Sequence, residues 1–430
     1  MRIVNLTEDT KNDILKNLLK RSPSQYTEYE KTVADILSDV KEKGDEAVFE
    51  LTKRFDKWDI DKTNVKVTKE EIDAAYKAVD AEFIDVLKEA AENIRIFHEK
   101  QLRDSWFFSK KDGSILGQKI TPIDSVGCYA PGGKAYYPSS VLMNIIPAKV
   151  AGVERIALAT PAVGGVVQPV TLVAADIAGV DEIYKVGGAQ AVGAFAYGTE
   201  SIKKVDKITG PGNIFVALAK KAVFGQVGID SIAGPSEILV IADETANPRY
   251  VAADLLSQAE HDELASAILL TTSSEFASKV SEEVDGFVKE LDRSQIIKKS
   301  LDNYGYILVG ESMDDIIDAA NEIASEHVEI MTKDAARVMT KVRNAGAIFV
   351  GPYSSEPLGD YFAGPNHILP TNGTAKFFSP LNVDDFTKKT SIISYSEEGL
   401  RAVHDKIEYF AKKECLTAHA NSIAVRYEER

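Results

Sequence analysis

Apolar residues recur with a helical period over the first hundred positions of the chain. Thr68-Lys69-Glu70-Glu71 is a capping-box pattern, in which the Thr hydroxyl and a Glu side chain satisfy unpaired backbone donors at a helix start. Behind it, apolar residues follow at spacings of three and four: Ile72, Ala75, Val79, Phe83, Val86, Leu87 and Ala90. This spacing predicts one long helix to about Arg95 within a helical N-terminal region.

From about residue 123, short apolar runs alternate with helical patterns. The predicted strands are Ser125–Tyr129, Arg155–Ala159, Glu182–Val186, Lys204–Ile208, Glu237–Ala242, Ala267–Thr271, Tyr306–Val309, Val328–Met331 and Ala347–Val350. The predicted helices between them include Ser139–Ala151, Pro169–Ala178, Asn213–Phe224, Tyr250–Glu263, Glu275–Leu291 and Asp314–Ala324. This alternation is typical of βαβ units with parallel sheets. Because 430 residues exceed one ordinary domain of about 100–200 residues, we expect two doubly wound, incomplete Rossmann-like sheets in an α/β fold.

The C-terminal part has a different texture. Gly351–Ser379 is rich in Gly, Pro, Asn and Ser and has no clear period, so it is expected to contribute loops to a site. After it, Ser396–Glu414 is predicted to be a terminal helix and Ser422–Arg426 a last short strand, which together make a small C-terminal segment.

Charge and cysteine content narrow the classes of function. With 66 acidic and 50 basic residues the net charge is −16, which disfavours nucleic acid and anionic membrane surfaces as partners. Two cysteines are too few for a disulfide framework and fit a reducing compartment. The N-terminus lacks the apolar segment of a secretory signal, and no apolar run approaches the roughly 20 residues of a membrane span. We therefore expect a cytoplasmic protein.

Two polar clusters at the ends of apolar elements are candidates for metal or proton chemistry. Gln258 and His261 are three residues apart near a helix end, so their side chains share one face and can converge on one ion; a solvated helix end is the open alternative. Glu326 and His327 are adjacent at a helix-to-strand junction. They would supply two proton acceptors of different basicity, although an exposed polar turn is the commoner arrangement.

Further candidate side chains lie towards the C-terminus. Asp360 follows a glycine and is either a ligand or a turn former, and His367 is ambiguous in the same way. His419 follows the predicted terminal helix and is either a ligand or a helix cap. His98 and His404 lie on heavily charged helices, and we expect both at the surface.

Gln258, His261, Asp360 and His419 would together form a ligand set of nitrogen and oxygen atoms without thiolate. Zinc suits imidazole and carboxylate ligands, and an amide oxygen is a weaker but allowed ligand. Spacing alone does not establish that these four side chains converge.

Glycine-rich motifs mark junctions between predicted strands and helices. Gly187-Gly188-Ala189-Gln190 and Gly210-Pro211-Gly212-Asn213 stand where helix N-termini favour phosphates, but tight turns explain them equally well, and neither is the G-x-G-x-x-G fingerprint. At a third junction, Tyr129 could stack on a cofactor ring. Cys128 beside it is expected to be an inert small apolar residue.

Taken in order, the motifs resemble those of the histidinol dehydrogenase family and cover the chain from about residue 120 to its end. They are Gly127-Cys128-Tyr129-Ala130-Pro131-Gly132-Gly133, Val186-Gly187-Gly188-Ala189-Gln190-Ala191, Thr209-Gly210-Pro211-Gly212-Asn213, Ala233-Gly234-Pro235-Ser236-Glu237, Gln258-Ala259-Glu260-His261, Ser325-Glu326-His327-Val328-Glu329, Phe362-Ala363-Gly364-Pro365-Asn366-His367 and Thr417-Ala418-His419.

The resemblance implies an activity and a set of site residues. The family oxidises L-histidinol to L-histidine through L-histidinaldehyde with two NAD, the last steps of histidine biosynthesis, as a homodimer with one zinc per subunit. It implies Glu326 and His327 as the acid–base pair, with His327 taking the alcohol proton and Glu326 activating water. The other implied roles are zinc ligands Gln258, His261, Asp360 and His419; NAD contacts Tyr129, Gln190 and Asn213; and histidinol contacts Ser236, Gln258, His261, His327, Asp360, Glu414 and His419.

The resemblance also implies a division of the chain. Residues 1–24 would form an N-terminal helical arm. Residues 25–122 with 238–380 would form the first α/β domain, with the metal and acid–base residues, and 123–237 a second, NAD-binding α/β domain. Residues 381–430 would form a C-terminal extension that reaches into the partner's active site.

Two other functions are compatible with the same residues. One is a zinc-dependent hydrolase with Glu326 as base, which histidinol-dependent NADH production would exclude. The other is a non-catalytic protein that binds NAD or a metal.

Overall fold

The computed structural model describes residues 1–21, 27–132 and 136–428. Up to the smaller of its two parallel sheets, the elements are β1 (Arg2–Asn5), α1 (Glu8–Leu19), α2 (Thr27–Lys43), α3 (Asp45–Asp56), α4 (Lys69–Ala78), α5 (Ala81–Glu99), β2 (Trp106–Ser109), β3 (Ile115–Pro122), β4 (Ser125–Tyr129), α6 (Pro138–Ala151), β5 (Arg155–Ala159), α7 (Pro169–Ala178), β6 (Glu182–Tyr184), α8 (Gly188–Tyr197), β7 (Lys207–Thr209), α9 (Ile214–Val223) and β8 (Gly228–Ile229).

The remaining elements form most of the larger sheet and the C-terminal part. They are β9 (Glu237–Ala242), α10 (Pro248–Ala259), β10 (Ser266–Thr271), α11 (Ser274–Phe287), α12 (Ser294–Tyr304), β11 (Gly305–Val309), α13 (Met313–Ile323), β12 (His327–Met331), α14 (Ala335–Met339), β13 (Ala347–Val350), α15 (Glu356–Tyr361), the 3₁₀ turns η2 (Thr374–Lys376) and η3 (Val383–Phe386), β14 (Thr387–Ser394), α16 (Glu397–Arg401), α17 (His404–Lys413) and α18 (Thr417–Ala424).

Two parallel sheets form the first compact unit, residues 1–101 and 123–386. The larger has six strands in the order β1-β11-β10-β9-β12-β13, and the smaller has five in the order β6-β5-β4-β7-β8. Every neighbouring pair in both sheets is parallel. All nine predicted strands are present, and the predicted fold class is confirmed.

The N-terminal arm begins with a strand, which the prediction of a purely helical arm missed. β1 pairs with β11 at the edge of the larger sheet. α1 buries Ile14 and Leu18 against the same sheet, because these residues lie on one face of the helix. Residues 22–24 of the predicted arm lie outside the described residues.

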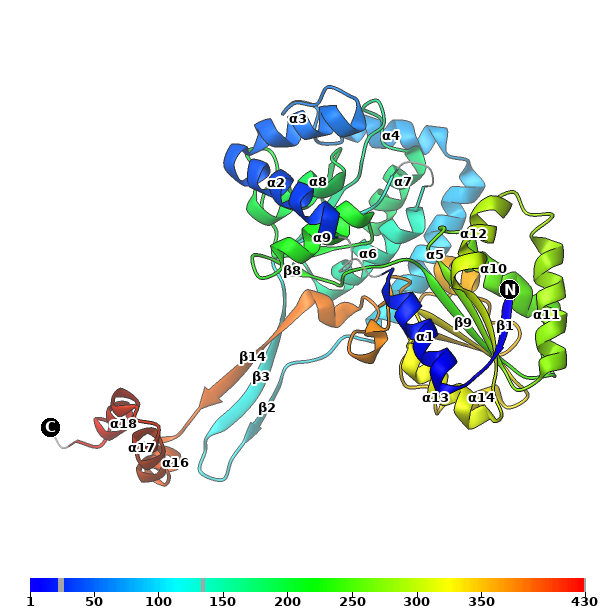
Figure 1. Ribbon diagram of the computed structural model, residues 1–430. Coiled ribbons are helices and arrows are strands. Elements are labelled where there is room, and N and C mark those ends of the chain that lie inside the picture. The colour runs from blue at the N-terminus through cyan, green and yellow to red at the C-terminus, as the bar shows by residue number, and fades with distance from the viewer. Residues whose placement is uncertain (22–26, 133–135, 429–430) are drawn as a thin grey trace. The chain divides into compact units, whose positions relative to one another are not determined.

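The helices between residues 27 and 99 pack against the helices that cover the smaller sheet (Figure 1). The predicted division instead groups residues 25–122 with 238–380, which contain most of the larger sheet. α2 contacts α8 and α9, α4 contacts α7, and α5 contacts α6. The apolar face of α2, including Val33, Leu37 and Val40, is buried in one cluster with residues of α8 and α9. These helices therefore cover the sheet that carries the glycine motifs.

The predicted long helix from Thr68 to Arg95 is two helices. The capping box at Thr68 is present, since its hydroxyl accepts from the backbone N–H of Glu71 and the Glu71 carboxylate accepts from the N–H of Thr68. Asp80 starts a second helix, because its carboxylate accepts from the N–H of Phe83 at 2.8 Å. The apolar stripe continues across this break, so periodicity alone did not reveal it.

The second compact unit consists of residues 102–122 and the described residues from Thr387 onward. It contains an antiparallel sheet in the order β14-β3-β2 and the helices α16, α17 and α18. The predicted single helix Ser396–Glu414 is broken at Ala402–Val403. The predicted strand Ser422–Arg426 is wrong, because Ser422 to Ala424 belong to α18. Among the described residues, no helix is both long and apolar enough to span a bilayer.

Candidate active site

The amino ends of β9 and β12 bring the predicted acid–base pair to one edge of the larger sheet. These strands are parallel neighbours, with His327 in register with Ile238. The N–H of Glu237 donates to Oε2 of Glu326 at 2.9 Å, and the N–H of Glu326 donates to Oε2 of Glu237 at 3.4 Å. Ser236, half-buried, directly precedes β9 at this edge, and its carbonyl accepts from the N–H of Ser266.

The His327 ring is held in one tautomer with a free acceptor. Its Nδ1 lies 3.0 Å from the carbonyl oxygen of Glu237, and because a carbonyl only accepts, Nδ1 carries the proton. Nε2 is buried and has no hydrogen-bond partner in the described part of the chain. Burial lowers the pKa of His327 to about 4, so the imidazole is neutral near pH 7. The geometry makes Nε2 a proton acceptor.

Glu326 is buried beside this ring, with its Oε2 3.6 Å from Nδ1 of His327. Burial, and after it the negative charge of Glu237, raises the pKa of Glu326 well above its usual value. A raised pKa makes the carboxylate a stronger proton acceptor once it is ionised. Glu237 itself is paired with Arg21, which the sequence analysis did not single out.

Gln258 and His261 approach the same edge from the C-terminal end of α10. In a βαβ unit the helix runs back along the sheet, so α10 ends where β9 and β10 begin. The Gln258 side chain is buried, and its Oε1 lacks a partner among the described residues. His261 is half-buried.

α15 supplies two carboxyl groups to this cluster. Asp360 places Oδ1 3.9 Å from Nε2 of His327. Burial raises the pKa of Asp360 to about 6 and that of Glu356 to about 8, the latter also because of the nearby Asp360 charge. Ligand atoms of His327, Glu356 and Asp360 lie within 4.8 Å of one another, close enough to share an ion.

Glu356 was missed by the sequence analysis, although a signal for it exists. Ser355-Glu356-Pro357 places a proline in the first turn, which is typical of a helix start. A helix from this point places Glu356 four residues before Asp360, on the same face.

His367 links the cluster to the smaller sheet. Its Nδ1 lies 3.0 Å from the carbonyl oxygen and 3.6 Å from Oδ1 of Asp360. Its Nε2 lies 3.1 Å from Oγ of Ser140, on the helix α6 that follows β4. The expectation that His98 lies at the surface is wrong. His98 is fully buried, and Nδ1 contacts the carbonyl oxygen of Ile94 at 2.7 Å.

The three predicted NAD contacts line one cavity of about 680 Å³. Tyr129 ends β4, Gln190 lies in the first turn of α8, and Asn213 caps α9 by accepting from two backbone N–H groups. The Tyr129 hydroxyl accepts from the N–H of Gly188 at 3.1 Å. All three therefore stand at the carboxyl edge of the smaller sheet, where parallel sheets commonly bind ligands. As expected, Cys128 is buried, and burial raises the pKa of its thiol to about 12.

Glu414 and His419 belong to the second unit. Both are exposed and line a pocket of about 800 Å³ on that unit, together with Phe410 and Leu416. α17 and α18 pack on each other and bring the two residues into this pocket.

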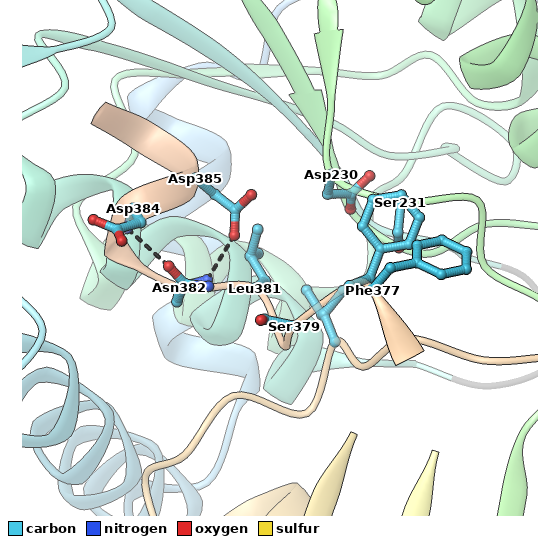
Figure 2. Close-up of a pocket in the computed structure, with 10 residues that line it drawn as sticks. Asp230, Ser231, Phe377, Ser379, Leu381, Asn382, Asp384 and Asp385 are labelled. Atoms are coloured by element: carbon cyan, nitrogen blue, oxygen red, sulfur yellow. Dashed lines mark hydrogen bonds between the residues drawn. The ribbon is translucent and has the colours of Figure 1, made fainter. Parts of the chain in front are cut away.

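A smaller polar pocket of about 250 Å³ has a structural explanation (Figure 2). Its Asp385 carboxylate pairs with Nζ of Lys207 at 2.9 Å and accepts from the N–H of Asn382 at 3.0 Å. Its Asp230 carboxylate pairs with Lys220. These acidic groups are already paired within the protein, so the pocket is not a candidate active site.

Comparisons with known proteins identify the family. The family model described as histidinol dehydrogenase matches residues 19–427. The chain belongs to the histidinol dehydrogenase family. Histidinol dehydrogenases from Clostridium acetobutylicum and Bacillus subtilis are 55% and 56% identical, over 96% and 95% of this chain and 95% and 96% of their own lengths. The crystal structure of histidinol dehydrogenase from Elizabethkingia anophelis matches with a TM-score of 0.93 at 37% identity, covering 99% of this chain and 98% of that one. The resemblance predicted from the motifs is confirmed, and the family match includes every candidate residue above.

Proposed function

We propose that this chain is a zinc-containing, NAD-dependent dehydrogenase that oxidises L-histidinol to L-histidine through L-histidinaldehyde. Membership of the histidinol dehydrogenase family supports the substrate and the reaction class. The observation that carries the residue assignment is the buried Nε2 of His327, which has no hydrogen-bond partner among the described residues and faces Asp360 beside Glu326.

In the first half-reaction, His327 takes the alcohol proton. Its Nδ1–H is committed to the carbonyl oxygen of Glu237, so Nε2 is the acceptor, and the neutral ring has the charge state that proton uptake needs. As the hydroxyl proton moves to Nε2, a hydride leaves the carbon that bears the hydroxyl group, and the aldehyde forms. When bound, NAD would supply the hydride acceptor, with one NAD molecule for each of the two hydrides.

In the second half-reaction, Glu326 acts on water. The hydrogen bond from the Glu237 N–H holds one carboxylate oxygen of Glu326 and leaves the other for a water molecule. The carboxylate removes a proton as the water oxygen attacks the aldehyde carbon. The hydrated aldehyde, which carries one deprotonated oxygen after this attack, then loses a hydride from carbon and the proton of its remaining hydroxyl group, and the product is a carboxylate. Keeping the aldehyde in this buried site protects a reactive intermediate from release.

The residues fit a zinc ion. Gln258 presents a buried oxygen that has no hydrogen-bond partner within the described part of the chain, and His261 and Asp360 supply an imidazole and a carboxylate, which are ligands that zinc accepts. His419 from a second copy of the chain would complete the predicted set. The ion would fix the imidazole and amino nitrogens of histidinol and polarise the reacting oxygen.

The cavity of about 680 Å³ at the smaller sheet fits the cofactor. It lies in the size range of ligand pockets, and it combines the Tyr129 ring with the amide side chains of Gln190 and Asn213. His367 connects the two sheets, since it contacts both Asp360 and Ser140 on α6, the helix that follows Tyr129.

A homodimer with shared active sites is supported by the surface of the second unit. Its sheet exposes Trp106, Phe107 and Phe108, each by half or more, and Ile393 by 74%. Exposed apolar area of this kind marks interaction surfaces. Glu414 and His419 lie on the same unit. A second copy of the chain that covers this surface would therefore also be the copy whose active site they would enter. Cytoplasmic location and the absence of nucleic-acid and membrane partners stay predictions.

The test measures NADH produced per histidinol by zinc-loaded and chelator-stripped protein. We expect about two NADH per histidinol with zinc. A hydrolase that uses Glu326 as base would produce none, and neither would a protein that only binds NAD or a metal.

Variants then assign the roles. His327→Asn is expected to fold and keep its zinc but lose turnover of histidinol. Glu326→Gln is expected to lose turnover of added histidinaldehyde. His404→Asn, on α17, is the matched control and should leave both activities unchanged. Normal turnover by His327→Asn would refute its assignment.

A further inference from the structure

The turn that follows β7 is packed against the neighbouring strand without space for a side chain. Gly210 has φ of +110°, and a Cβ at this position would lie 2.1 Å from the carbonyl oxygen of Tyr129. Three residues later Asn213 caps α9. The turn therefore sets the positions of two side chains of the cofactor cavity, Tyr129 through backbone contact and Asn213 through the chain itself.

A buried ion pair holds both backbone groups of Gly210. Its N–H donates to Oδ2 of Asp230 at 2.7 Å, and its carbonyl accepts from Nζ of Lys220 at 2.9 Å. Lys220 and Asp230 also pair with each other, and their side chains are only 2% and 5% exposed. Lys220 comes from α9 and Asp230 follows β8, so two other elements of the fold fix this one residue.

Burying both charges is not explained by stability. Taking a lysine and a carboxylate out of water costs several kcal/mol per ion, and well-packed apolar residues at such places are often as stabilising or more so. Unlike apolar residues, an ion pair supplies a hydrogen-bond donor and a hydrogen-bond acceptor, and here both bond to the backbone of Gly210. The pair thus fixes the orientation of Gly210.

We propose that Lys220 and Asp230 are positioning residues for the dinucleotide, which act by clamping Gly210 and thereby aligning Asn213 and Tyr129. This inference rests on the proposed function, in which the cavity binds NAD. Neither residue lines that cavity, so both act through the turn.

The experiment measures the dissociation constant of NAD by titration calorimetry for the full chain and two variants, Lys220→Met and Asp230→Asn. Lys149→Met is the matched control. It breaks a less buried pair with Asp181, which stands before β6 at the opposite, amino edge of the same sheet. Steady-state KM values for NAD and for histidinol, and zinc content, are measured alongside.

We expect each variant to weaken NAD binding about ten-fold or more, because a small displacement of binding groups is costly. KM for histidinol and zinc content should stay within about two-fold of the unchanged protein, and Lys149→Met should match the unchanged protein throughout. Asp230→Asn is nearly isosteric and keeps an acceptor for the Gly210 N–H, so it serves if Lys220→Met does not fold.

The outcomes separate the two claims. If the unchanged protein binds NAD and both folded variants bind it within two-fold of that value, the inference is overturned and the proposed function stands. If KM for histidinol rises as much as KM for NAD, the pair has a general structural role and the inference is again wrong. If the unchanged protein does not bind NAD, the proposed function falls and the inference falls with it.

Discussion

Breaking the buried pair between Arg21 and Glu237 should destabilise the first unit far more than breaking a surface pair. Nη2 of Arg21 lies 2.5 Å from Oε1 of Glu237, and the two side chains are 0% and 4% exposed. Arg21 also donates to the carbonyl oxygen of Leu264 at 2.8 Å. Arg21→Met therefore leaves a buried carboxylate without its cation and a carbonyl without its donor.

The magnitude follows from this burial. Removing one partner of a buried pair costs about 3–5 kcal/mol, because the other charge remains desolvated. For a unit of this size, such a loss lowers the unfolding temperature by about 5 °C. Activity should fall as well, because Oε2 of Glu237 accepts from the N–H of Glu326 and the Glu237 N–H holds the Glu326 carboxylate.

The assay is urea unfolding of Arg21→Met, Glu237→Gln and the double variant. Arg249→Met is the control, since the Arg249–Glu283 pair is 60% and 37% exposed and should contribute at most about 1 kcal/mol. The double variant should be more stable than the sum of the two single losses predicts, because no unpaired charge remains. An Arg21→Met loss no larger than that of Arg249→Met, or additive losses, would refute this reasoning.

Three further predictions follow from buried polar groups. Gln258→Leu should fold normally but bind zinc more weakly, because it removes an amide oxygen that no described residue hydrogen-bonds, and a competitive metal titration measures this. Burial keeps the pKa of His98 below its usual value of about 6.5, so its contribution to stability is complete above that pH and is lost as pH falls through the folded-state pKa. Urea unfolding at pH 7 and pH 5 should therefore show that the free energy of unfolding falls less between these pH values for His98→Gln than for the unchanged protein. In a thiol-reagent assay, Cys415, which is exposed, should react in the native protein, and Cys128 only after denaturation.

The central strands were predictable because each is a short apolar run bounded by glycine or polar residues. β9, for example, is buried at every position and reads as continuous apolar sequence after Glu237. β1 was missed because two of its four residues are polar and it lies at the edge of its sheet. β2 was missed because all four of its residues are exposed, so no buried face marks it.

The site was predictable only in part from local pattern. Gln258 with His261 and Glu326 with His327 are close in sequence, and spacing indicates that each pair acts together. That Asp360 approaches His327 depends on the order of strands in the larger sheet and on α15, which no local pattern shows. Glu237 escaped notice because, in sequence, it is only the first residue of an apolar strand.

The two sheets present opposite ends to the proposed chemistry, and electrostatics gives a reason. Two candidate zinc ligands, Gln258 and His261, stand at the C-terminal end of α10, the negative end of a helix dipole, and burial raises the pKa values of the nearby carboxyl groups of Asp360 and Glu356. A divalent cation is favoured there. The proposed NAD cavity stands at the N-terminal ends of α8 and α9, the positive ends, which favour an anionic dinucleotide. A cation site and an anion site could not share one edge of one parallel sheet without opposing its helix dipoles. Joining the amino edge of one sheet to the carboxyl edge of another, through His367, satisfies both and leaves His327 Nε2 at the side of the candidate cation site, where under the proposed function it would receive the proton.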